Sequence, residues 1–369
     1  MKLVFATTTL LLDQFEKHSM IAGCLSKWQD LGHDVCIQMA LPQRQRATAK
    51  KILRKNVCML TSENSYELTG LDCQIDFSDE WLKPRSVSEF FLDYLELTQP
   101  DFVLVDYLEY PIVKAAMDWC PAKTIVLLAN VDFPRQLDLN EFPEIGDAYL
   151  KIQNVIVTSS LLERLSRAEI PWARTYCLPQ PLPAWTEESC MLKPRHWIFT
   201  DATRETEIPF ILELARKNPS EKFVFLKFEG KGRNSKLPTN VLVISNPKNV
   251  HEIFAKAKGF LAPSQKPMSN CKFALEAMAL RLPVLTSESS CLTEITSSVY
   301  RLPTDIESWS AALKDRSIRA PSLQAELMFQ VAEYRMKVRV HFRNFFDLLE
   351  QPSKPKLHQE VQSARAIFL

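Results

Sequence analysis

The sequence predicts an α/β protein of two domains, each built around a mainly parallel sheet. Short apolar runs alternate with segments of helical periodicity through the first half of the chain, and a proline-rich stretch interrupts this pattern near residue 180. The same alternation then restarts. Apolar strands alternating with helices are typical of parallel sheets covered on both faces, and a chain of 369 residues is long enough for two such cores.

The first half of the chain supplies the elements of the first predicted domain. Apolar residues recur at helical spacing from Ile21 to Trp28, and Gly32 suits the end of that helix. Further helices are expected at Val87–Leu97 and Tyr110–Trp119. The predicted strands are Leu3–Ala6, Val35–Met39, Phe102–Val105, Thr124–Leu128 and Val155–Val157.

The second half repeats this order after the stretch Leu178–Trp185, whose three prolines predict a stiff, extended connector. Strands are expected at Trp197–Phe199, Phe223–Leu226, Val241–Ile244 and Gly259–Ala262, and helices at Phe210–Arg216, Val250–Ala257 and Pro321–Leu349. We therefore expect a first domain at 1–180, a linker at 181–190, a second domain at 191–325, a C-terminal helix at 326–350 and a tail at 351–369.

Composition narrows the classes of function. The net charge of +1 gives no global attraction to nucleic acid. Neither a membrane span nor a signal peptide is recognisable, and the nine scattered cysteines favour reduced thiols in a cytoplasmic protein. We expect no metal site, because the sequence has no Asp-x-Asp motif and its six histidines are isolated. The chain has only 7 glycines where about 26 are usual.

The most informative segment runs from the strand Gly259–Ala262 to Thr286. It reads as strand, Pro263-Ser264, a loop, a helix with Glu276-Ala277-Met278-Ala279, a turn at Arg281-Leu282, and a strand that begins with Pro283-Val284. Ligands of such βαβ units bind at the carboxyl ends of the strands. The segment resembles the nucleotide-sugar signature of retaining glycosyltransferases of family 4, which have a fold called GT-B. The resemblance covers most of the chain and is strong from Val250 to Ile295.

The resemblance implies two Rossmann-like domains that face each other across a cleft, with the C-terminal helix packed back on the first domain. It also implies transfer of a sugar from a nucleotide donor, of UDP or GDP type, to an acceptor hydroxyl, with retained configuration and without metal or cofactor. Glu276 would hold the ribose hydroxyls. Ser264, together with Ser269 and Asn270 at the helix start, would contact the donor and its diphosphate. An exposed Glu276 paired with Lys272, and plain capping by Ser269 and Asn270, are the structural alternatives.

The sequence departs from that signature at the positions that address the donor's sugar and diphosphate. Met268 stands where the first Glu of the motif is expected, and a thioether accepts only weak hydrogen bonds. Asp201 and Thr206 stand where the family carries an Arg and a Lys. Arg204, Lys227 or Lys231 would have to supply the missing cation, unless these are solvated surface charges.

Polar residues that follow strands of the first domain are candidates for the reacting end of the site. Asp106 ends the strand that begins at Phe102, and Asn130 and Asp132 follow the strand Thr124–Leu128. The carboxyl ends of parallel strands carry the chemistry in such sheets. We expect these three residues to face the acceptor, with turn or capping roles as the alternative. The threonines Thr7–Thr9 replace the family's Gly-rich turn.

A basic segment, Arg44–Lys55, carries six cations and no acid. Such a segment suits contact with an anionic membrane surface or with a nucleic-acid backbone. In the first case the protein would lie at the inner membrane surface and its acceptor would be a saccharide or a lipid-linked molecule. A solvated charged face is the other interpretation. Two rival functions follow: a DNA-modifying glycosyltransferase that tracks the phosphate backbone, and a non-catalytic relative that acts as a binding partner.

Overall fold

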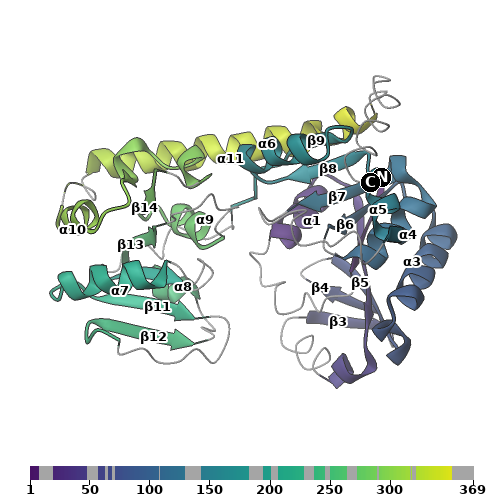
Figure 1. Cartoon of the computed structure of the whole chain (residues 1–369), viewed down its shortest axis with the longest axis horizontal. Helices are drawn as coiled ribbons and strands as arrows, with labels where there is room; N and C mark the ends of the chain where they lie inside the picture. Colours follow the sequence, from purple (N-terminus) through teal and green to yellow (C-terminus); the bar gives the residue numbers. More distant parts are fainter. Residues whose placement is uncertain are drawn as a thin grey trace. The chain divides into compact units, whose positions relative to one another are not determined.

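The computed structural model describes fifteen strands and the helices between them, in two compact units (Figure 1). Unit 1 comprises Met1–Pro181 and Val338–Leu369, and unit 2 comprises Leu182–Lys337. The described residues are 1–7, 20–47, 57–62, 65–68, 71–107, 109–128, 143–182, 194–200, 207–227, 237–245, 250–263, 272–288, 291–315, 317 and 321–350.

Unit 1 is built on a nine-stranded sheet in the order β3-β4-β5-β2-β1-β6-β7-β8-β9. Its strands are β1 (Lys2–Thr7), β2 (Asp34–Leu41), β3 (Val57–Ser62), β4 (Ser65–Leu68), β5 (Leu71–Phe77), β6 (Phe102–Asp106), β7 (Thr124–Leu128), β8 (Asn154–Val157) and β9 (Arg174–Cys177). Its helices are α1 (Met20–Asp30), α3 (Pro84–Thr98), α4 (Tyr110–Trp119), α5 (Pro143–Leu150) and α6 (Ser160–Glu169). The pairs β3–β4 and β4–β5 are antiparallel and the others are parallel.

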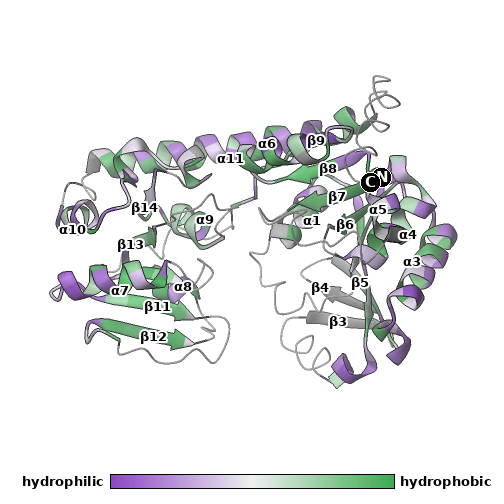
Figure 2. Ribbon diagram, in the orientation of Figure 1, coloured by the Kyte–Doolittle hydropathy of each residue, from purple (hydrophilic) through white to green (hydrophobic). Residues whose placement is uncertain are grey.

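Both faces of this sheet are covered, because residues on successive positions of its strands point to opposite sides. On one face Val103, Val105 and Val126 join a core with α3, α4 and α5. On the other, Trp28 of α1 packs on rings near the C-terminal end of the last helix, α11 (Pro321–Glu350). Strands β1, β6, β7 and β8 are almost wholly apolar and buried, as a two-sided sheet requires (Figure 2).

Unit 2 is built on a six-stranded parallel sheet in the order β12-β11-β10-β13-β14-β15. Its strands are β10 (His196–Thr200), β11 (Phe223–Lys227), β12 (Val241–Ser245), β13 (Ala257–Ala262), β14 (Val284–Ser287) and β15 (Arg301–Leu302). Its helices are α7 (Ile208–Lys217), α8 (Val250–Phe254), α9 (Lys272–Ala279) and α10 (Ile306–Lys314), with the first part of α11.

The two faces of the second sheet carry different helices. Trp197, Phe199 and Phe225 pack with α7 and α10 in one core. On the opposite face Phe260 of β13 stacks on Phe254 of α8, and Phe254 also stacks on Phe273 of α9. Connections after β10 and after β13 therefore lead to helices on opposite faces of the sheet.

Short 3₁₀ helices complete the chain, at Gln43–Gln45, Asp79–Leu82, Pro121–Lys123, Cys291–Glu294 and Ser298–Tyr300. Side chains cap the starts of two of the described α-helices. The Ser159 hydroxyl accepts from the N–H of Leu162 at the start of α6, and Asp305 accepts from Ser308 at the start of α10.

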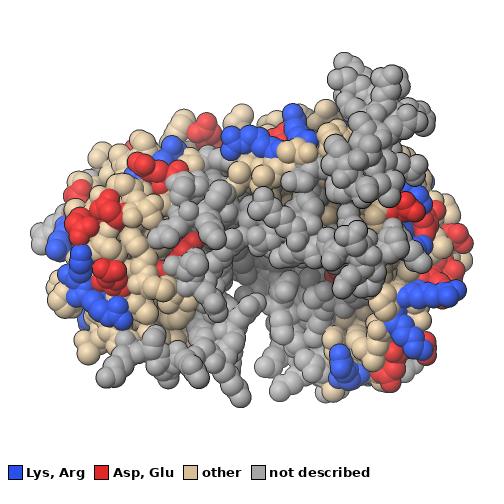
Figure 3. Space-filling model, in the orientation of Figure 1, with Lys and Arg blue, Asp and Glu red and all other residues tan. Residues whose placement is uncertain are grey.

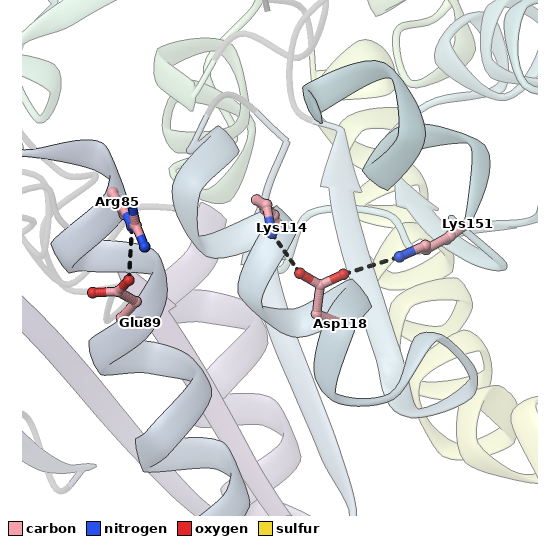
Figure 4. Close-up of polar contacts among 5 residues, drawn as sticks. All are labelled: Arg85, Glu89, Lys114, Asp118 and Lys151. Atoms are coloured by element: carbon pink, nitrogen blue, oxygen red, sulfur yellow. Dashed lines mark hydrogen bonds and ion pairs between the residues drawn. The ribbon is translucent and has the colours of Figure 1, made fainter. Parts of the chain in front are cut away.

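Surface charges in unit 1 join neighbouring helices. Asp118 of α4 accepts hydrogen bonds from Lys114 at 2.6 Å and from Lys151, just beyond α5, at 2.9 Å (Figure 4). Partial burial acts to raise the pKa of Asp118, but the two lysines outweigh it and lower that pKa. Arg85 and Glu89 of α3 form a fully exposed pair one turn apart (Figure 4). On the face drawn in Figure 3, cations and acids of the described residues are interspersed.

The predicted elements agree with the structure in most places. The strand at Thr124–Leu128 and the helix at Tyr110–Trp119 have the expected bounds. Three differences stand out. Ala257, expected at a helix end, begins β13. The strands β3, β4 and β5 add an antiparallel edge, and α10 and β9 were not predicted. The linker 181–190 lies almost wholly outside the described residues.

Candidate functional site

Each sheet has a switch point, where neighbouring parallel strands continue into connections on opposite faces. In unit 2 it lies between β10 and β13, and in unit 1 between β1 and β6. Ligands of doubly wound sheets bind outside the carboxyl ends of the strands at such points. We call the carboxyl ends of the strands in each unit its carboxyl edge, and both candidate regions lie there.

The carboxyl edge of unit 2 gathers buried polar side chains. Thr200 ends β10, Thr286 and Ser287 end β14, and none of these three is exposed to solvent. Glu207 precedes α7 and is 2% exposed. Ala262 pairs directly with Thr286, and Thr200 pairs with Leu226, so these strand ends are adjacent along the edge. Buried polar groups at one edge of an apolar sheet mark a place where specific hydrogen bonding has been retained.

Glu276 lies in the second turn of α9, which packs on β13 and β14. Its residue exposure is 2%, and the helix positions around it are also buried, from Phe273 to Ala279. A carboxylate in such surroundings is costly to bury, because it loses its hydration. The alternative interpretation of Glu276 as an exposed helix residue is therefore wrong. A ligand that reached this carboxylate would meet a group held in a fixed, largely apolar surrounding.

The turn after α9 is formed without glycine. Arg281 adopts φ +58°, and the N–H of Leu282 donates to the carbonyl of Ala277 at 2.9 Å while that of Arg281 donates to Met278 at 2.8 Å. This pair of hydrogen bonds is the Schellman arrangement, which normally ends in Gly. Pro283 then leads into β14, where its carbonyl accepts from the N–H of Phe260. The turn predicted from Arg281-Leu282 is thus made at the cost of a left-handed arginine.

Close packing also fixes β13. A Cβ built on Gly259 would lie 2.7 Å from the Pro283 carbonyl oxygen and 2.7 Å from the Trp197 ring. Only glycine fits where this strand passes its neighbours. The strand that leads to the switch point is therefore held rigidly between β10 and β14.

The carboxyl edge of unit 1 carries polar side chains that bond to one another. β1 and β6 are paired as far as Ala6 and Val105, so the next residues, Thr7 and Asp106, end these neighbouring strands side by side. The Thr7 hydroxyl donates to the carboxylate of Glu109 at 2.5 Å, and Glu109 precedes α4. Asp106 is partly exposed. Carboxylates in this position can accept hydrogen bonds from sugar hydroxyls.

A tyrosine supports this edge from within. The Tyr149 hydroxyl donates to the Tyr107 carbonyl at 2.5 Å, and the two rings meet edge to face at 4.6 Å. Burial is the main cause that raises the pKa of Tyr149, and the nearby Tyr107 and Asp106 raise it further. Tyr149 therefore stays protonated and fixes the backbone next to Asp106.

The predicted site residues fall into two groups. Asp106, Lys227 and Glu276 are described, at the end of β6, at the end of β11 and in α9. The other candidates lie outside the described residues: Asn130, Asp132, Arg204, Ser264, Ser269 and Asn270, with Met268, Asp201, Thr206, Lys231, Thr8 and Thr9. Glu109 and Glu207 were not predicted; Glu109 follows the end of β6 by three residues, and Glu207 follows the end of β10 by seven.

The basic segment is described only through Ala47. Arg44 is exposed, whereas Arg46 lies over the ring of Phe77 at 5.7 Å in a cation–π contact. Arg46 is therefore engaged with its own unit. No helix among the described residues is long and apolar enough to cross a membrane, and no group of three potential metal ligands occurs within them.

Solved structures of glycosyltransferases resemble the whole chain. A glycosyltransferase from Rickettsia africae ESF-5 is 12% identical, with a TM-score of 0.64 over 95% of this chain and 98% of that one. Alr3699/HepE from Anabaena, in complex with UDP and glucose, is 10% identical, with a TM-score of 0.65 over 95% and 100%. The fold is GT-B. WaaG, a glycosyltransferase involved in lipopolysaccharide biosynthesis, gives a TM-score of 0.58 at 11% identity, over 95% and 100%.

The GT-B likeness is one of structure. No protein-family model matches the chain, and no curated protein matches it. At the 9–12% identity of the neighbours, the likeness shows the fold alone. The chemistry of the two carboxyl edges depends on the residues of this GT-B chain itself.

Proposed function

We propose that this protein is a nucleotide-sugar-dependent glycosyltransferase that moves a sugar to an acceptor hydroxyl, with retention and without a metal ion or cofactor. The observation that carries the proposal is Glu276, a carboxylate buried in the helix that follows the switch-point strand β13. The GT-B fold supports it, since two neighbours of that fold were solved with UDP-containing molecules.

Glu276 would accept hydrogen bonds from the two ribose hydroxyls of a UDP- or GDP-type donor. Each hydrogen bond to a charged group contributes about 1.5–3 kcal/mol. Ser264, Ser269 and Asn270 would place hydroxyl, amide and backbone groups near the diphosphate, at the helix start. Arg204 or Lys227 would neutralise the leaving diphosphate, which needs a cation in the transition state.

Unit 1 would supply the acceptor side of the reaction. Asp106, at the switch point of its sheet, would bind a hydroxyl of the acceptor or of the transferred sugar. Asn130 and Asp132, which follow β7, would complete that side. The Thr7–Glu109 hydrogen bond and the Tyr149 hydroxyl would keep this edge in place.

A thermal-shift screen with UDP-glucose, GDP-mannose, ADP-glucose and CMP-sialic acid tests the proposal. A donor present at 100 times its Kd adds about 2.7 kcal/mol of stability. We expect one donor to raise Tm equally for the wild type and for Glu213→Gln, an exposed glutamate on α7, and to raise it clearly less for Glu276→Gln. An equal shift in all three proteins would contradict the role of Glu276, and no shift with any donor would contradict the function.

A non-catalytic binding role is the second candidate. Met268, Asp201 and Thr206, which replace a glutamate and two cations of the resembled signature, favour it. A protein of this kind would bind a nucleotide without releasing sugar from it. An assay of donor hydrolysis, which measures the release of free UDP or GDP, separates the two functions. Binding of a donor without any such release supports the non-catalytic role.

A further inference from the structure

The helix α11 has two apolar stripes on opposite sides. Its inner stripe, buried in the cores of the two units, consists of Leu327, Val331, Tyr334, Val338, Phe342, Phe345 and Leu349. A helix on the surface of a globular protein needs only one such stripe. Yet five of the ten exposed large hydrophobic side chains among the described residues lie on α11: Met328, Phe329, Met336, Val340 and Leu348. Exposed apolar residues gathered on one element indicate a surface that another body covers.

The centre of the exposed side is formed by Phe329, Met336 and Val340, which we call the outer stripe. Their exposed fractions are 70%, 68% and 46%. At about 100° per residue these three positions fall within roughly 40° of one another around the helix. Figure 2 shows hydrophobic and hydrophilic residues alternating along α11. The outer stripe therefore points away from the inner one along about three turns of helix.

Cations flank the outer stripe. Arg335, Arg339 and Arg343 lie along one side of it and Lys337 along the other, and all four are exposed. Glu333 is the one acid between Met328 and Asn344. An apolar stripe between long basic side chains is the pattern of a helix that lies in the interface of an anionic bilayer.

We propose that α11 docks on an anionic membrane surface, with the outer stripe among the acyl chains and the four cations at the lipid phosphates. A protein partner fits less well, because a stable interface buries about 800 Å² on each side, and three side chains on one convex helix fall short of that. A nucleic-acid backbone fits less well still, because the apolar side chains occupy the centre of the surface. This proposal goes beyond glycosyl transfer and does not depend on it.

Co-sedimentation of the full chain with vesicles tests the proposal, using phosphatidylcholine alone and phosphatidylcholine mixed with phosphatidylglycerol. We expect binding only to the mixed vesicles, weakened by salt. The double variant Phe329→Gln/Met336→Gln should bind at least about tenfold more weakly, because two large apolar side chains no longer enter the bilayer. The variant Arg339→Glu/Arg343→Glu should lose about fivefold or more for each charge.

Matched controls separate the outer stripe from general surface effects. Leu97→Gln removes an 86% exposed leucine from α3, and Arg216→Glu reverses an exposed charge on α7. Both should bind mixed vesicles like the wild type, and unchanged far-UV circular dichroism verifies that every variant is folded. The proposal is overturned if the wild type does not sediment with mixed vesicles, or if the stripe variants bind as well as the controls. A concentration-dependent dimer that Phe329→Gln abolishes, without vesicle binding, would instead assign the surface to a second copy.

Discussion

The carboxyl edges of the two sheets hold their polar side chains in different ways. In unit 1, Asp106 is partly exposed, beside a threonine and a glutamate that bond to each other. In unit 2, Glu207 and Glu276 are each 2% exposed. A buried carboxylate is fixed before any ligand arrives, and such preorganisation saves the entropy of ordering it. The carboxyl edge of unit 2 thus suits the part of a ligand that is bound tightly and is the same in every reaction cycle. The carboxyl edge of unit 1 suits a part that is exchanged.

The largest expected effect separates these two edges directly. Glu276→Gln should weaken donor binding by about 10- to 100-fold, since a charge-assisted hydrogen bond contributes about 1.5–3 kcal/mol. Asp106→Asn should leave donor Kd unchanged and lower turnover. Isothermal calorimetry with the donor found in the screen, together with initial rates, measures both. Equal losses of donor affinity in the two variants would remove the distinction between the edges.

Two glycines provide the next comparison. Gly259→Ala should destabilise unit 2 by about 1–3 kcal/mol, because its Cβ meets backbone and a tryptophan ring at 2.7 Å. Gly146→Ala should stabilise unit 1 by about 0.5–1 kcal/mol, because it lies in α5 with nothing within 4 Å of its Cβ. Urea unfolding of both variants gives the two free energies. Changes of the same sign would show that the packing around Gly259 can relax.

A smaller effect is expected at the left-handed residues that end α9 and α3. Arg281→Gly should stabilise the protein by about 0.5–1 kcal/mol, because glycine adopts φ +58° without the steric cost of a side chain. Gln99→Gly should stabilise it less, because the Gln99 amide also donates to the Glu96 carbonyl at 2.8 Å. Thermal unfolding compares the two. A decrease of Tm for Arg281→Gly would mean that the arginine side chain contributes more than its backbone costs.

The smallest effect is a pH dependence. Burial is the main cause that lowers the pKa of His196 below its usual 6.5, against a hydrogen bond to the Ile253 carbonyl that raises it. As pH falls, the unfolded chain therefore binds the proton at a higher pH than the folded chain does. His196 costs no stability above pH 6.5, where it is neutral in both states. Below pH 6.5 the free energy of unfolding decreases as pH falls toward the lowered pKa.

His196→Gln should flatten this decline between pH 7 and pH 5. His33→Gln in unit 1 should do the same to a smaller extent, because the pKa of His33 is also lowered by its burial but that ring is more exposed. Urea unfolding at several pH values measures both slopes. An unchanged slope in His196→Gln would show that its proton affinity is the same in the folded and unfolded chain.

Much of the fold could be predicted because its signals are local. The strand Thr124–Leu128 is apolar throughout, and the helix Tyr110–Trp119 begins with Pro111 in its first turn, so both were predicted with their bounds. The antiparallel strands β3 and β4 mix polar and apolar residues, and their pairing depends on contacts that no local pattern encodes. Ala257 has no branched side chain to favour a strand, and its position in β13 is set by pairing with His196.

The site was harder to predict than the fold. Glu276 was found because a motif surrounds it, whereas its burial depends on α9 being packed on every side. Glu109 has no motif, and only the pairing of β1 with β6 brings it to Thr7, across 102 residues of sequence. The left-handed Arg281 was equally hidden, because a sequence with few glycines uses ordinary residues where the backbone turns.

The continuous helix α11 contributes Leu327 to the core of unit 2 and Phe345 to the aromatic cluster around Trp28 in unit 1. A gene segment ending at the proline-rich connector would encode the first sheet without the rings that cover Trp28. We expect such a fragment to fold poorly by itself, because Trp28 would lose the rings on which it packs. The first half of the chain and the end of α11 therefore belong to one folding unit, although unit 2 separates them in the sequence.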